Sequence, residues 1–305
     1  MKNNYTDSLA DVISERLAPG RERQFGFEYE FMPGREMGFE DLEGVWRILE
    51  DMGYRKEPNL FQGKDHYITF EPGGQIEFCS IPISTRDNST VHSILLQAAT
   101  VNAAIRERIG LEYIPTGFIP GRGSAKMLLD KPRYHNLHNL LSRTGTRGHE
   151  MMKGTAAIHL HVGLASLGEL PLIWNTVCEM SRTADFAMGF ERRHIWDNTD
   201  PSRCGLMCGR EQGVITDFRA FLEKMTEFGM GALDLATGVP FGELPNKGFH
   251  DFLDHLTTLF TDVRINMKGV TLELRTLDSV PPEVFLQRWQ QFLSLVQQSL
   301  EMAEV

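Results

Sequence analysis

Short segments in which polar and apolar residues alternate constrain the fold of this chain more than any other feature. Successive side chains of a β-strand point to opposite faces, so residues two apart share a face. In the segment FGFEYEF, Glu28 and Glu30 therefore share a face that opposes aromatic side chains. In the segment GGQIEFCS, Gln75, Glu77 and Cys79 share a face in the same way. We expect two strands, each with an acidic face and an apolar face.

Two later segments repeat this pattern with other titratable groups. TAAIHLHVG places His159 and His161 on one face, and VTLELRTLD places Glu273 and Arg275 on one face. A solvated face is the usual explanation for a single strand of this kind, but such a face normally includes Lys, and these polar positions carry none. Glu is disfavoured in strands, and neighbouring like charges are destabilising unless they are neutralised. Divalent cations would neutralise them; carboxylate oxygens favour Mg²⁺, with Mn²⁺ as an alternative.

A further acidic residue precedes a turn signal in the segment TFEPGGQIEFCS. Glu71 is followed by Pro72, Gly73 and Gly74, which indicate either a pair of strands or one strand with a kink. Either geometry changes the course of the chain between Glu71 and Glu77. We therefore expect both carboxylates to reach the same cluster.

The rest of the chain alternates such strands with amphipathic helices. No repeat, low-complexity tract or linker divides it, so we expect one catalytic domain over residues 1–305. The fold class is α+β, with an antiparallel or mixed sheet and helices on its apolar face. Apolar periodicity predicts helices over residues 6–18, 38–53, 90–110, 133–145, 170–191, 218–229, 248–264 and 282–305.

Composition excludes several classes of protein. The formal net charge of −10 and the lack of a basic stripe argue against a nucleic-acid partner. No apolar run approaches a membrane span, and the polar N-terminus lacks a signal peptide, so we expect a cytoplasmic protein without a membrane partner. Cys204 and Cys208 have no second Cys or His pair at zinc-site spacing, which argues against structural zinc.

A carboxylate cluster that holds Mg²⁺ suggests nucleotide chemistry. Mg²⁺ is usually bound by few carboxylates together with substrate phosphates. Phosphoryl transfer also needs a cation near the transferred group, and Arg275 stands two residues from Glu273. No P-loop motif is present, and the Gly-rich GRGSAK over residues 121–126 has the wrong context for a phosphate loop.

Five blocks of the sequence resemble the glutamate–cysteine ligase family, in its plant and proteobacterial branch. EPGGQIEFCS resembles the family's EPGGQ-x-E-[LF]-S signature, and FGFEYEF resembles its first acidic strand. The other blocks are RYHNLHNLLSRTGTRGHEMM, RRHIWDNTDPSRCGL and DHLTTLFTDVRINMKGVTLELRTLD, which occur in the family's order. The resemblance implies a glutamine-synthetase-like fold, in which a curved antiparallel sheet forms a funnel with helices on its outer face. It also implies a carboxylate–amine ligase that uses ATP and two or three Mg²⁺ ions.

The reaction that this resemblance implies joins glutamate to an amine such as cysteine through a γ-glutamyl phosphate, a step of glutathione biosynthesis. The implied partners are therefore small molecules, with the oligomeric state left open. Arg275 and Glu273 would be catalytic, and Arg275 would stabilise the transferred phosphoryl group. The implied cofactor contacts are His159, His161, Arg275 and Gln75; the implied substrate contacts are Arg193, Trp196 and Arg203; the implied metal ligands are Glu28, Glu30, Glu71, Glu77 and Glu273.

The sequence also departs from the family, and these departures leave alternatives open. The strand IHLHVG differs from the plant branch, and LMCGREQG replaces a Pro-Phe segment after DPSRCG. Both changes fall near the expected amino-acid pocket, so the acceptor could be a different amine or a peptide. A catalytically silent relative that binds nucleotide or amino acid is the other alternative, although an idle site has no evident reason to keep a like-charge cluster.

Overall fold

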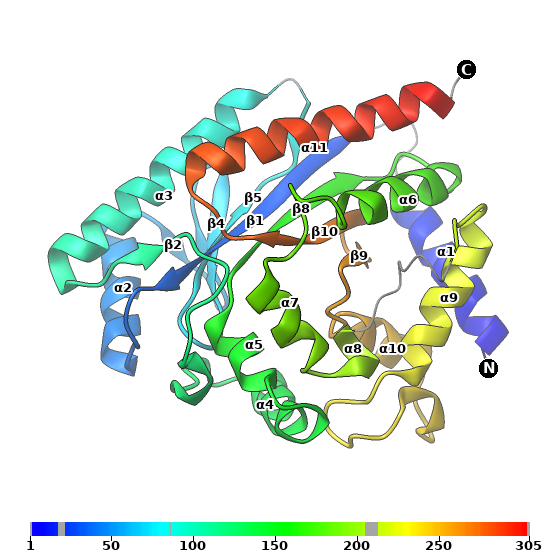
Figure 1. Ribbon diagram of the computed structural model, residues 1–305, viewed down its shortest axis with the longest axis horizontal. Coiled ribbons are helices and arrows are strands. Elements are labelled where there is room, and N and C mark those ends of the chain that lie inside the picture. Colours follow the sequence, from blue (N-terminus) through cyan, green and yellow to red (C-terminus); the bar gives the residue numbers. More distant parts are fainter. Residues whose placement is uncertain (1, 18–21, 86, 205–212, 304–305) are drawn as a thin grey trace.

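A broad antiparallel sheet forms the centre of the molecule (Figure 1). The structure is a computed structural model that describes residues 2–17, 22–85, 87–204 and 213–303. Within these residues the strands follow the order β2-β3-β4-β5-β1-β8-β10-β9, and β6 and β7 also pair with β1. The strands are β1 (Gln24–Pro33), β2 (Arg55–Lys56), β3 (Phe61–Gln62), β4 (His66–Phe70), β5 (Ile76–Ser80), β6 (Ile83–Ser84), β7 (Tyr113–Ile114), β8 (Ala157–Gly163), β9 (Val263–Asn266) and β10 (Thr271–Asp278).

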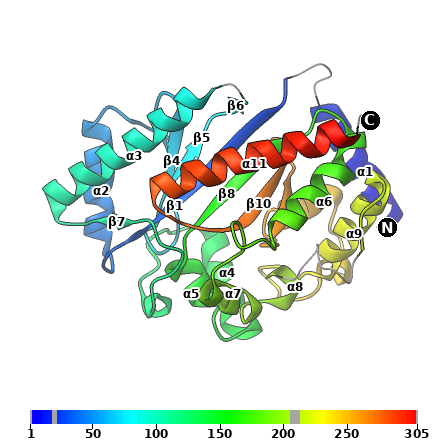
Figure 2. The same cartoon turned by 45° about the horizontal axis from the view of Figure 1, so that its top comes forward.

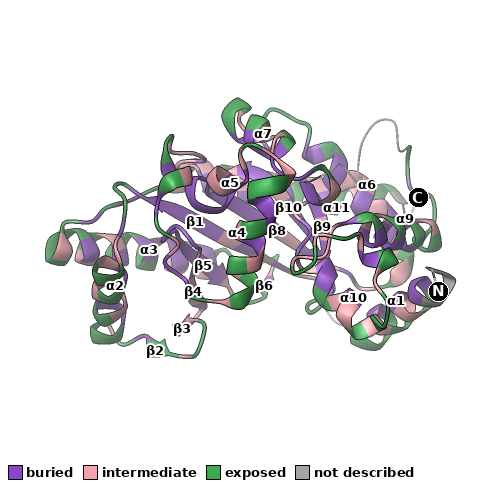
Figure 3. Ribbon diagram, turned by 90° about the horizontal axis from the view of Figure 1, so that it is seen from below, coloured by how far each residue is buried: buried purple, intermediate pink, exposed green. Residues whose placement is uncertain are grey.

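Helices surround this sheet on both sides. Three of them, α3, α6 and α11, run over one face, as Figure 2 shows for α3 and α11. Seen from below in Figure 3, α4, α5 and α7 lie across the other side of the sheet. The helices are α1 (Lys2–Arg16), α2 (Phe39–Asp51), α3 (Asn88–Ile109), α4 (Pro132–Thr144), α5 (Gly148–Gly154), α6 (Leu170–Met180), α7 (Phe190–Asp197), α8 (Pro201–Cys204), α9 (Phe218–Gly231), α10 (Phe249–Leu256) and α11 (Pro282–Ala303).

The aromatic residues of β1 explain why α11 packs where it does. Phe27 lies in edge contact with Phe285 and Trp289 of α11, with ring centroids 4.9 and 5.5 Å apart. Tyr29, two residues further along the same face, is 5.0 Å from the Phe285 ring. Burial of these large rings drives the packing of helix on sheet. Glu28 and Glu30 alternate with these aromatics and are thereby turned to the opposite face.

The predicted α+β class, with an antiparallel sheet and helices on its apolar face, is confirmed. The segment around Pro72–Gly74 is a hairpin: β4 and β5 pair antiparallel, with Thr69 opposite Glu77.

Among the helices of the described residues, none is long and apolar enough to cross a membrane. The single-domain organisation stays a prediction. Cys204 is buried with a free thiol, and Cys208 lies outside the described residues.

Two of the predicted helices were too long. The helix predicted over 170–191 ends at Met180, and α7 begins separately at Phe190. The helix predicted over 248–264 ends at Leu256, and the chain then enters β9. For the second helix the reason is sheet pairing. Val263 and Ile265 are buried on one face of β9, which pairs with β10 along its length. Helical periodicity in the preceding residues masked this alternation.

Candidate functional site

The register of the central strands assembles the predicted polar residues on one face of the sheet. Glu28 on β1 stands opposite Cys79 on β5 and opposite His159 on β8. Two residues further along β1, on the same face, Glu30 stands opposite Glu77. The face that the sequence predicted from four separate segments is therefore continuous in the structure.

The same face continues onto β10 and β9. His161 on β8 stands opposite Glu273 on β10, which in turn stands opposite Arg264 on β9. Glu273 is completely buried; Arg264 at 2.7 Å and Arg275 at 3.1 Å neutralise its charge, and the Asn266 amide donates a hydrogen bond to it at 2.8 Å. Charge-assisted bonds of this kind hold a carboxylate in its ionised form. Arg264 was missed by sequence reasoning because its segment was assigned to a helix, and Asn266, which lies just beyond that segment, was not singled out.

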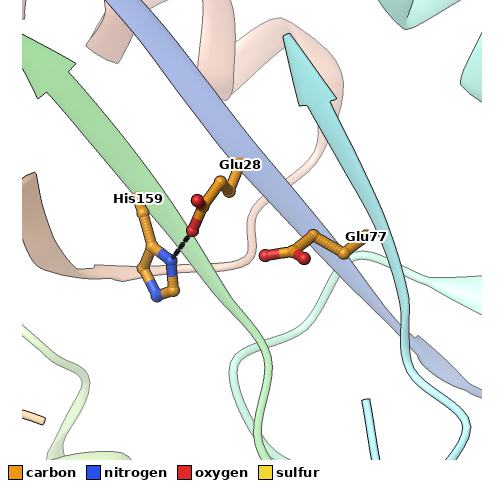
Figure 4. Close-up of side chains that lie close together, drawn as sticks. All are labelled: Glu28, Glu77 and His159. Atoms are coloured by element: carbon orange, nitrogen blue, oxygen red, sulfur yellow. Dashed lines mark hydrogen bonds and ion pairs between the residues drawn. The ribbon is translucent and has the colours of Figure 1, made fainter. Parts of the chain in front are cut away.

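Glu28 is the centre of this arrangement. His159 Nδ1 lies 2.6 Å from Glu28 Oε2, and the Glu77 carboxylate points toward the same space (Figure 4). On the other side, His161 Nε2 lies 3.5 Å from Glu28 Oε1, and His161 Nδ1 lies 3.9 Å from Glu273 Oε1. Glu28 thus faces an imidazole and a carboxylate on each side.

Two groups of side chains in the described part of the chain have a geometry suited to a metal ion. One consists of Glu28, Glu77 and His159, and the other of Glu28, His161 and Glu273. In each group the three ligand atoms lie within 4.8 Å of one another. Carboxylate oxygens suit Mg²⁺ and Mn²⁺, and imidazole nitrogen is an additional donor that transition metals accept. His161 Nε2 is buried and makes no hydrogen bond within the described residues; it faces Glu28 Oε1 at 3.5 Å.

The ionisation of the acidic residues also fits a site for cations. Burial, together with the neighbouring Glu71, raises the pKa of Glu30 to about 8, and burial with Glu77 raises the pKa of Glu71 to about 8. Burial, Glu28 and Glu30 likewise raise the pKa of Glu77 well above its ordinary value. These carboxyls hold protons because their negative charges are close together and poorly solvated. A bound cation would remove the cause of the shift.

Two other carboxylates remain ionised despite their burial. Burial opposes ionisation of Glu28, but His161 and His159 outweigh it, so its pKa is well below the ordinary value. Burial also opposes ionisation of Glu273, but Arg264, His161 and Arg275 lower its pKa to about 2. Conversely, burial and the nearby Arg275 lower the pKa of His159 to about 4, so this imidazole is neutral and can offer a lone pair.

The polar face opens into two cavities that share Glu28. The first, of about 280 Å³, contains the acidic residues and is closed on its far side by apolar side chains of α4, α5 and α7. The second, of about 370 Å³, lies beyond His161 and Cys79. The lining of the first is Glu28, Glu30, Glu71, Pro72, Gln75, Glu77, Arg133, Tyr134, Leu137, Met151, Met152, Thr155, Ala157, His159, Trp196, Phe260, Arg264 and Arg275.

Glu30 and Glu71 line the first cavity without joining either candidate metal group. Glu30 Oε2 accepts a hydrogen bond from the backbone N–H of Ala157 at 2.7 Å, which orients this carboxylate. Glu71 stands at the turn, where its backbone N–H donates to the carbonyl of Gln75 at 3.0 Å. The hairpin therefore brings Glu71 and Glu77 into one cavity, as expected.

Gln75, which we expected to contact a cofactor, uses its polar atoms in hydrogen bonds within the protein. Its amide nitrogen donates to the carbonyls of Met152 and Thr155 at 3.2 and 3.0 Å, and its oxygen accepts from the N–H of Gly73 at 2.9 Å. The side chain is only 2% exposed. Its polar atoms are committed to the backbone, so Gln75 holds the turn against α5, and its expected contact with a cofactor stays a prediction.

The three residues expected to contact an amino-acid substrate lie in different environments. Trp196 lines the first cavity, and its indole N–H donates to the Phe260 carbonyl at 2.9 Å. Arg193 points away from the cavity and pairs with Asp262 at 2.6 Å. Arg203 is fully buried and donates to the Thr258 carbonyl at 2.7 Å. Backbone carbonyls and Asp200 surround the Arg203 guanidinium, which indicates a structural role, and its expected contact with substrate stays a prediction.

Arg133 is a further residue that sequence reasoning missed. It lines the first cavity from the first turn of α4, and its Nη2 donates to the Thr257 carbonyl at 3.0 Å. Arg264 and Arg275 line the same cavity but pair with Glu273. Among the described residues, Arg133 makes no ion pair, so it is the cavity cation available to a ligand.

Together, the sheet and the site present two candidate cation-binding groups that share Glu28, at the place where two cavities meet. The model of one family, glutamate–cysteine ligase family 2 (GCS2), matches residues 24–182, which include β1, the hairpin and β8. The chain belongs to this family.

Individual relatives agree with this assignment. The chain is 28% identical over 300 residues to the chloroplastic glutamate–cysteine ligase of Arabidopsis thaliana, which covers 85% of this chain and 55% of that protein. It is 27% identical over 311 residues to the chloroplastic enzyme of Solanum lycopersicum, with 88% of this chain and 57% of that protein covered. The chain thus spans little more than half the length of these relatives.

The fold is similar to that of a solved structure, the glutamate–cysteine ligase of Francisella tularensis in complex with AMP. The TM-score is 0.50 at 10% sequence identity, and the match covers 92% of this chain and 68% of the other. At this identity the similarity concerns the fold alone.

Proposed function

We propose that this chain is an ATP- and metal-dependent carboxylate–amine ligase that joins the side-chain carboxylate of glutamate to an amine, with cysteine as the first candidate. The observation that carries the proposal is the position of Glu28, which is shared by two groups able to bind cations and lies where two cavities meet. A site that must hold a nucleotide and two amino acids around one transferred phosphoryl group needs this arrangement. The relatives named above are glutamate–cysteine ligases.

Each cavity suits one kind of substrate. The second cavity offers Tyr67 and Leu164 together with polar Asn266 and Thr271, which suits a base and a ribose. The first cavity offers carboxylate ligands on one wall and the apolar side chains of α4, α5 and α7 on the other. We therefore assign ATP to the second cavity and the amino acids to the first.

In the proposed reaction, a carboxylate oxygen of glutamate attacks the γ-phosphorus of ATP, and ADP leaves. The amine then attacks the acyl carbon, phosphate leaves, and the amine loses a proton. Bound Mg²⁺ or Mn²⁺ would supply charge neutralisation of the phosphates. Glu28, Glu77, Glu273, His159 and His161 would be the ligands that hold these ions.

Arg275 is our candidate for the cation that stabilises the transferred phosphoryl group. Its Nη1 lies 3.1 Å from Glu273 Oε2 and 3.4 Å from His159 Nδ1, so it stands between the two candidate metal groups. Nearby, Arg192 donates to the carbonyls of Arg275 and Thr276 at 2.9 and 2.6 Å and fixes the backbone at the bulge of β10. A preorganised cation loses little energy to reorganisation during the reaction.

Arg133 is our candidate for binding the α-carboxylate of an amino-acid substrate. A guanidinium binds a carboxylate through two parallel hydrogen bonds. Tyr134, Leu137 and Trp196 lie beside it and would receive the rest of the substrate.

The cytoplasmic location stays a prediction, and the relatives named above are chloroplast proteins by name.

The experiment is an assay of the purified chain with ATP, Mg²⁺ or Mn²⁺, glutamate and a panel of amines, with products identified by mass spectrometry. The expected result is release of ADP and phosphate and one γ-glutamyl product. A Glu77→Gln variant should lose this activity. If ADP never rises above background and no nucleotide binds, the proposed function is wrong. If a different amine reacts, only the acceptor is revised.

A further inference from the structure

A separate apolar cavity of about 160 Å³ lies on the opposite face of the sheet from the carboxylates. Its floor is formed by Phe31, Ile76 and Phe78 of β1 and β5, and one wall is formed by Leu95 and Val101 of α3. The other side is closed by β7 and by the first residue of α11. These walls are buried, and the cavity is built from residues far apart in the sequence. The shape of the cavity is therefore set by the same packing that forms the hydrophobic core.

The walls of this cavity offer no free polar side chain. The Asn102 side chain donates to the Tyr113 carbonyl at 2.9 Å and accepts from the Tyr113 N–H at 2.8 Å. The Tyr113 hydroxyl donates to the Gly74 carbonyl at 3.0 Å. Pro115 and Pro282, which complete the lining, have no N–H to donate. A water molecule needs two to four polar partners, so this space favours an apolar occupant.

The cavity is connected to the candidate site through the hairpin. Ile76 and Phe78 alternate with Glu77 on β5. A molecule that binds in the cavity and shifts these two side chains would therefore also shift the backbone that carries the Glu77 carboxylate. The hydrogen bond from Tyr113 also holds Gly74, which lies in the turn with a φ of +88°. An occupant that orders Tyr113 and β5 would thereby order the turn between Glu71 and Glu77.

We propose that this cavity is an effector site for a small neutral apolar molecule, of about six to nine non-hydrogen atoms and ring-shaped or branched. A cavity of about 150 Å³ with aliphatic and aromatic walls stays dry and takes up benzene. Ala99, an exposed residue of α3, lines the mouth and marks the route of entry. The inference concerns binding and the hairpin, and it does not depend on the proposed reaction.

The first test measures binding of benzene and indole by thermal shift and by titration calorimetry, without nucleotide or amino acids. Pyrimidine, which has the size of benzene but is strongly hydrated, is the control ligand. We expect one saturable site per chain and a rise in Tm of about 2 °C at ten times the dissociation constant. Absence of saturable binding, or an equal response to pyrimidine, overturns the proposal.

Two exposed alanines of α3 supply a matched pair of variants. Ala99→Phe blocks the mouth, whereas Ala103→Phe makes the same change on the same helix away from the cavity. Binding should be lost in the first variant and kept in the second. Ala98→Leu fills the cavity from within and serves as a second blocking variant. Equal binding by Ala99→Phe and Ala103→Phe overturns the location of the site.

The connection to the hairpin is tested by hydrogen exchange across residues 71–77. Exchange there should slow when benzene is bound, and this slowing should vanish in Ala99→Phe. Peptides from α9, which does not line the cavity, are the internal control. If benzene binds and exchange over residues 71–77 does not change, the role as an effector site is overturned.

Discussion

Nδ1 of His159 lies 2.6 Å from Oε2 of Glu28, across the antiparallel pair β1–β8. The second oxygen of the same carboxylate, Oε1, faces His161 at 3.5 Å. One carboxylate is therefore shared by both groups that could bind a cation. The rest of the site is arranged around this relationship, because β5 beside β1 contributes Glu77 and β10 beside β8 contributes Glu273.

Replacement of Glu28 should affect both candidate cation groups at once. For Glu28→Gln we expect the affinity for Mn²⁺ to fall about 100-fold or more, with loss of one bound ion, since an amide keeps the shape but not the charge. Titration calorimetry of the nucleotide-free protein measures this change. Glu40→Gln, an exposed change at the start of α2, is the control and should bind as the parent does. Parent-like binding by Glu28→Gln would place the cations elsewhere.

The raised pKa values predict how the stability of the metal-free protein depends on pH. Glu30 and Glu71 have pKa values of about 8 in the folded protein, above the ordinary value of 4.5, so the folded state holds their protons more tightly. Their contribution to stability is present at low pH and is lost as the pH rises through 8. In EDTA, Tm should therefore fall between pH 6.5 and 9. His161, whose pKa is raised because Glu28 and Glu273 outweigh its burial, contributes in the same direction.

A divalent cation should reverse this trend, because it binds the ionised carboxylates. The gain in Tm on adding Mn²⁺ should increase from pH 6.5 to pH 9, as followed by differential scanning fluorimetry. Glu71→Gln should flatten the dependence measured in EDTA. A Tm that does not change with pH in the parent protein would contradict close packing of these carboxyls.

Arg133 should matter for substrate affinity but not for folding. For Arg133→Met we expect KM for one amino-acid substrate to rise about tenfold or more, because a charge-assisted hydrogen bond to its carboxylate is lost. KM for ATP and the Tm should stay close to those of the parent. Arg143→Met, on the same helix and outside the described cavities, is the matched control. A rise in KM for ATP alone would move Arg133 to the nucleotide side.

Arg203 should show the opposite behaviour. Its guanidinium is fully buried and lies 3.5 Å from the buried carboxylate of Asp200, so Arg203→Met leaves an unpaired charge in the interior. We expect a loss of about 3 to 5 kcal/mol in the free energy of unfolding, measured by urea denaturation. Arg219→Met, which removes an exposed Arg, should cost about 0.5 kcal/mol or less. A raised KM with unchanged stability would support the expected contact with substrate.

The difference between Arg203 and Arg133 shows where sequence reasoning fails. Both residues stand in polar segments that resemble the family, and an arginine in such a segment suits a carboxylate equally well in either place. Only packing decides between them: backbone carbonyls of a distant loop enclose Arg203, and the start of α4 turns Arg133 toward the cavity. The same holds for Gln75, whose partners lie about eighty residues away in the sequence.

Alternation along single strands was sufficient to predict which residues share a face. The period of two is a local property of the backbone, so Glu28, Glu77, His159 and Glu273 could be assigned to polar faces without knowledge of the fold. The aromatic residues between them predicted the apolar face on which α11 packs. The sequence by itself thus determined β1, β5, β8 and β10 and the chemistry of their faces, whereas β9 was mistaken for the end of a helix.

Tertiary structure alone decided which of these groups meet. The order and register of the strands place Glu28 between His159 and His161 and bring Arg264 against Glu273. Register depends on long-range hydrogen bonds and on the packing of the opposite face, neither of which a local pattern encodes. The apolar cavity behind β5 has the same origin, because its walls come together only when α3, β7 and α11 pack on the sheet.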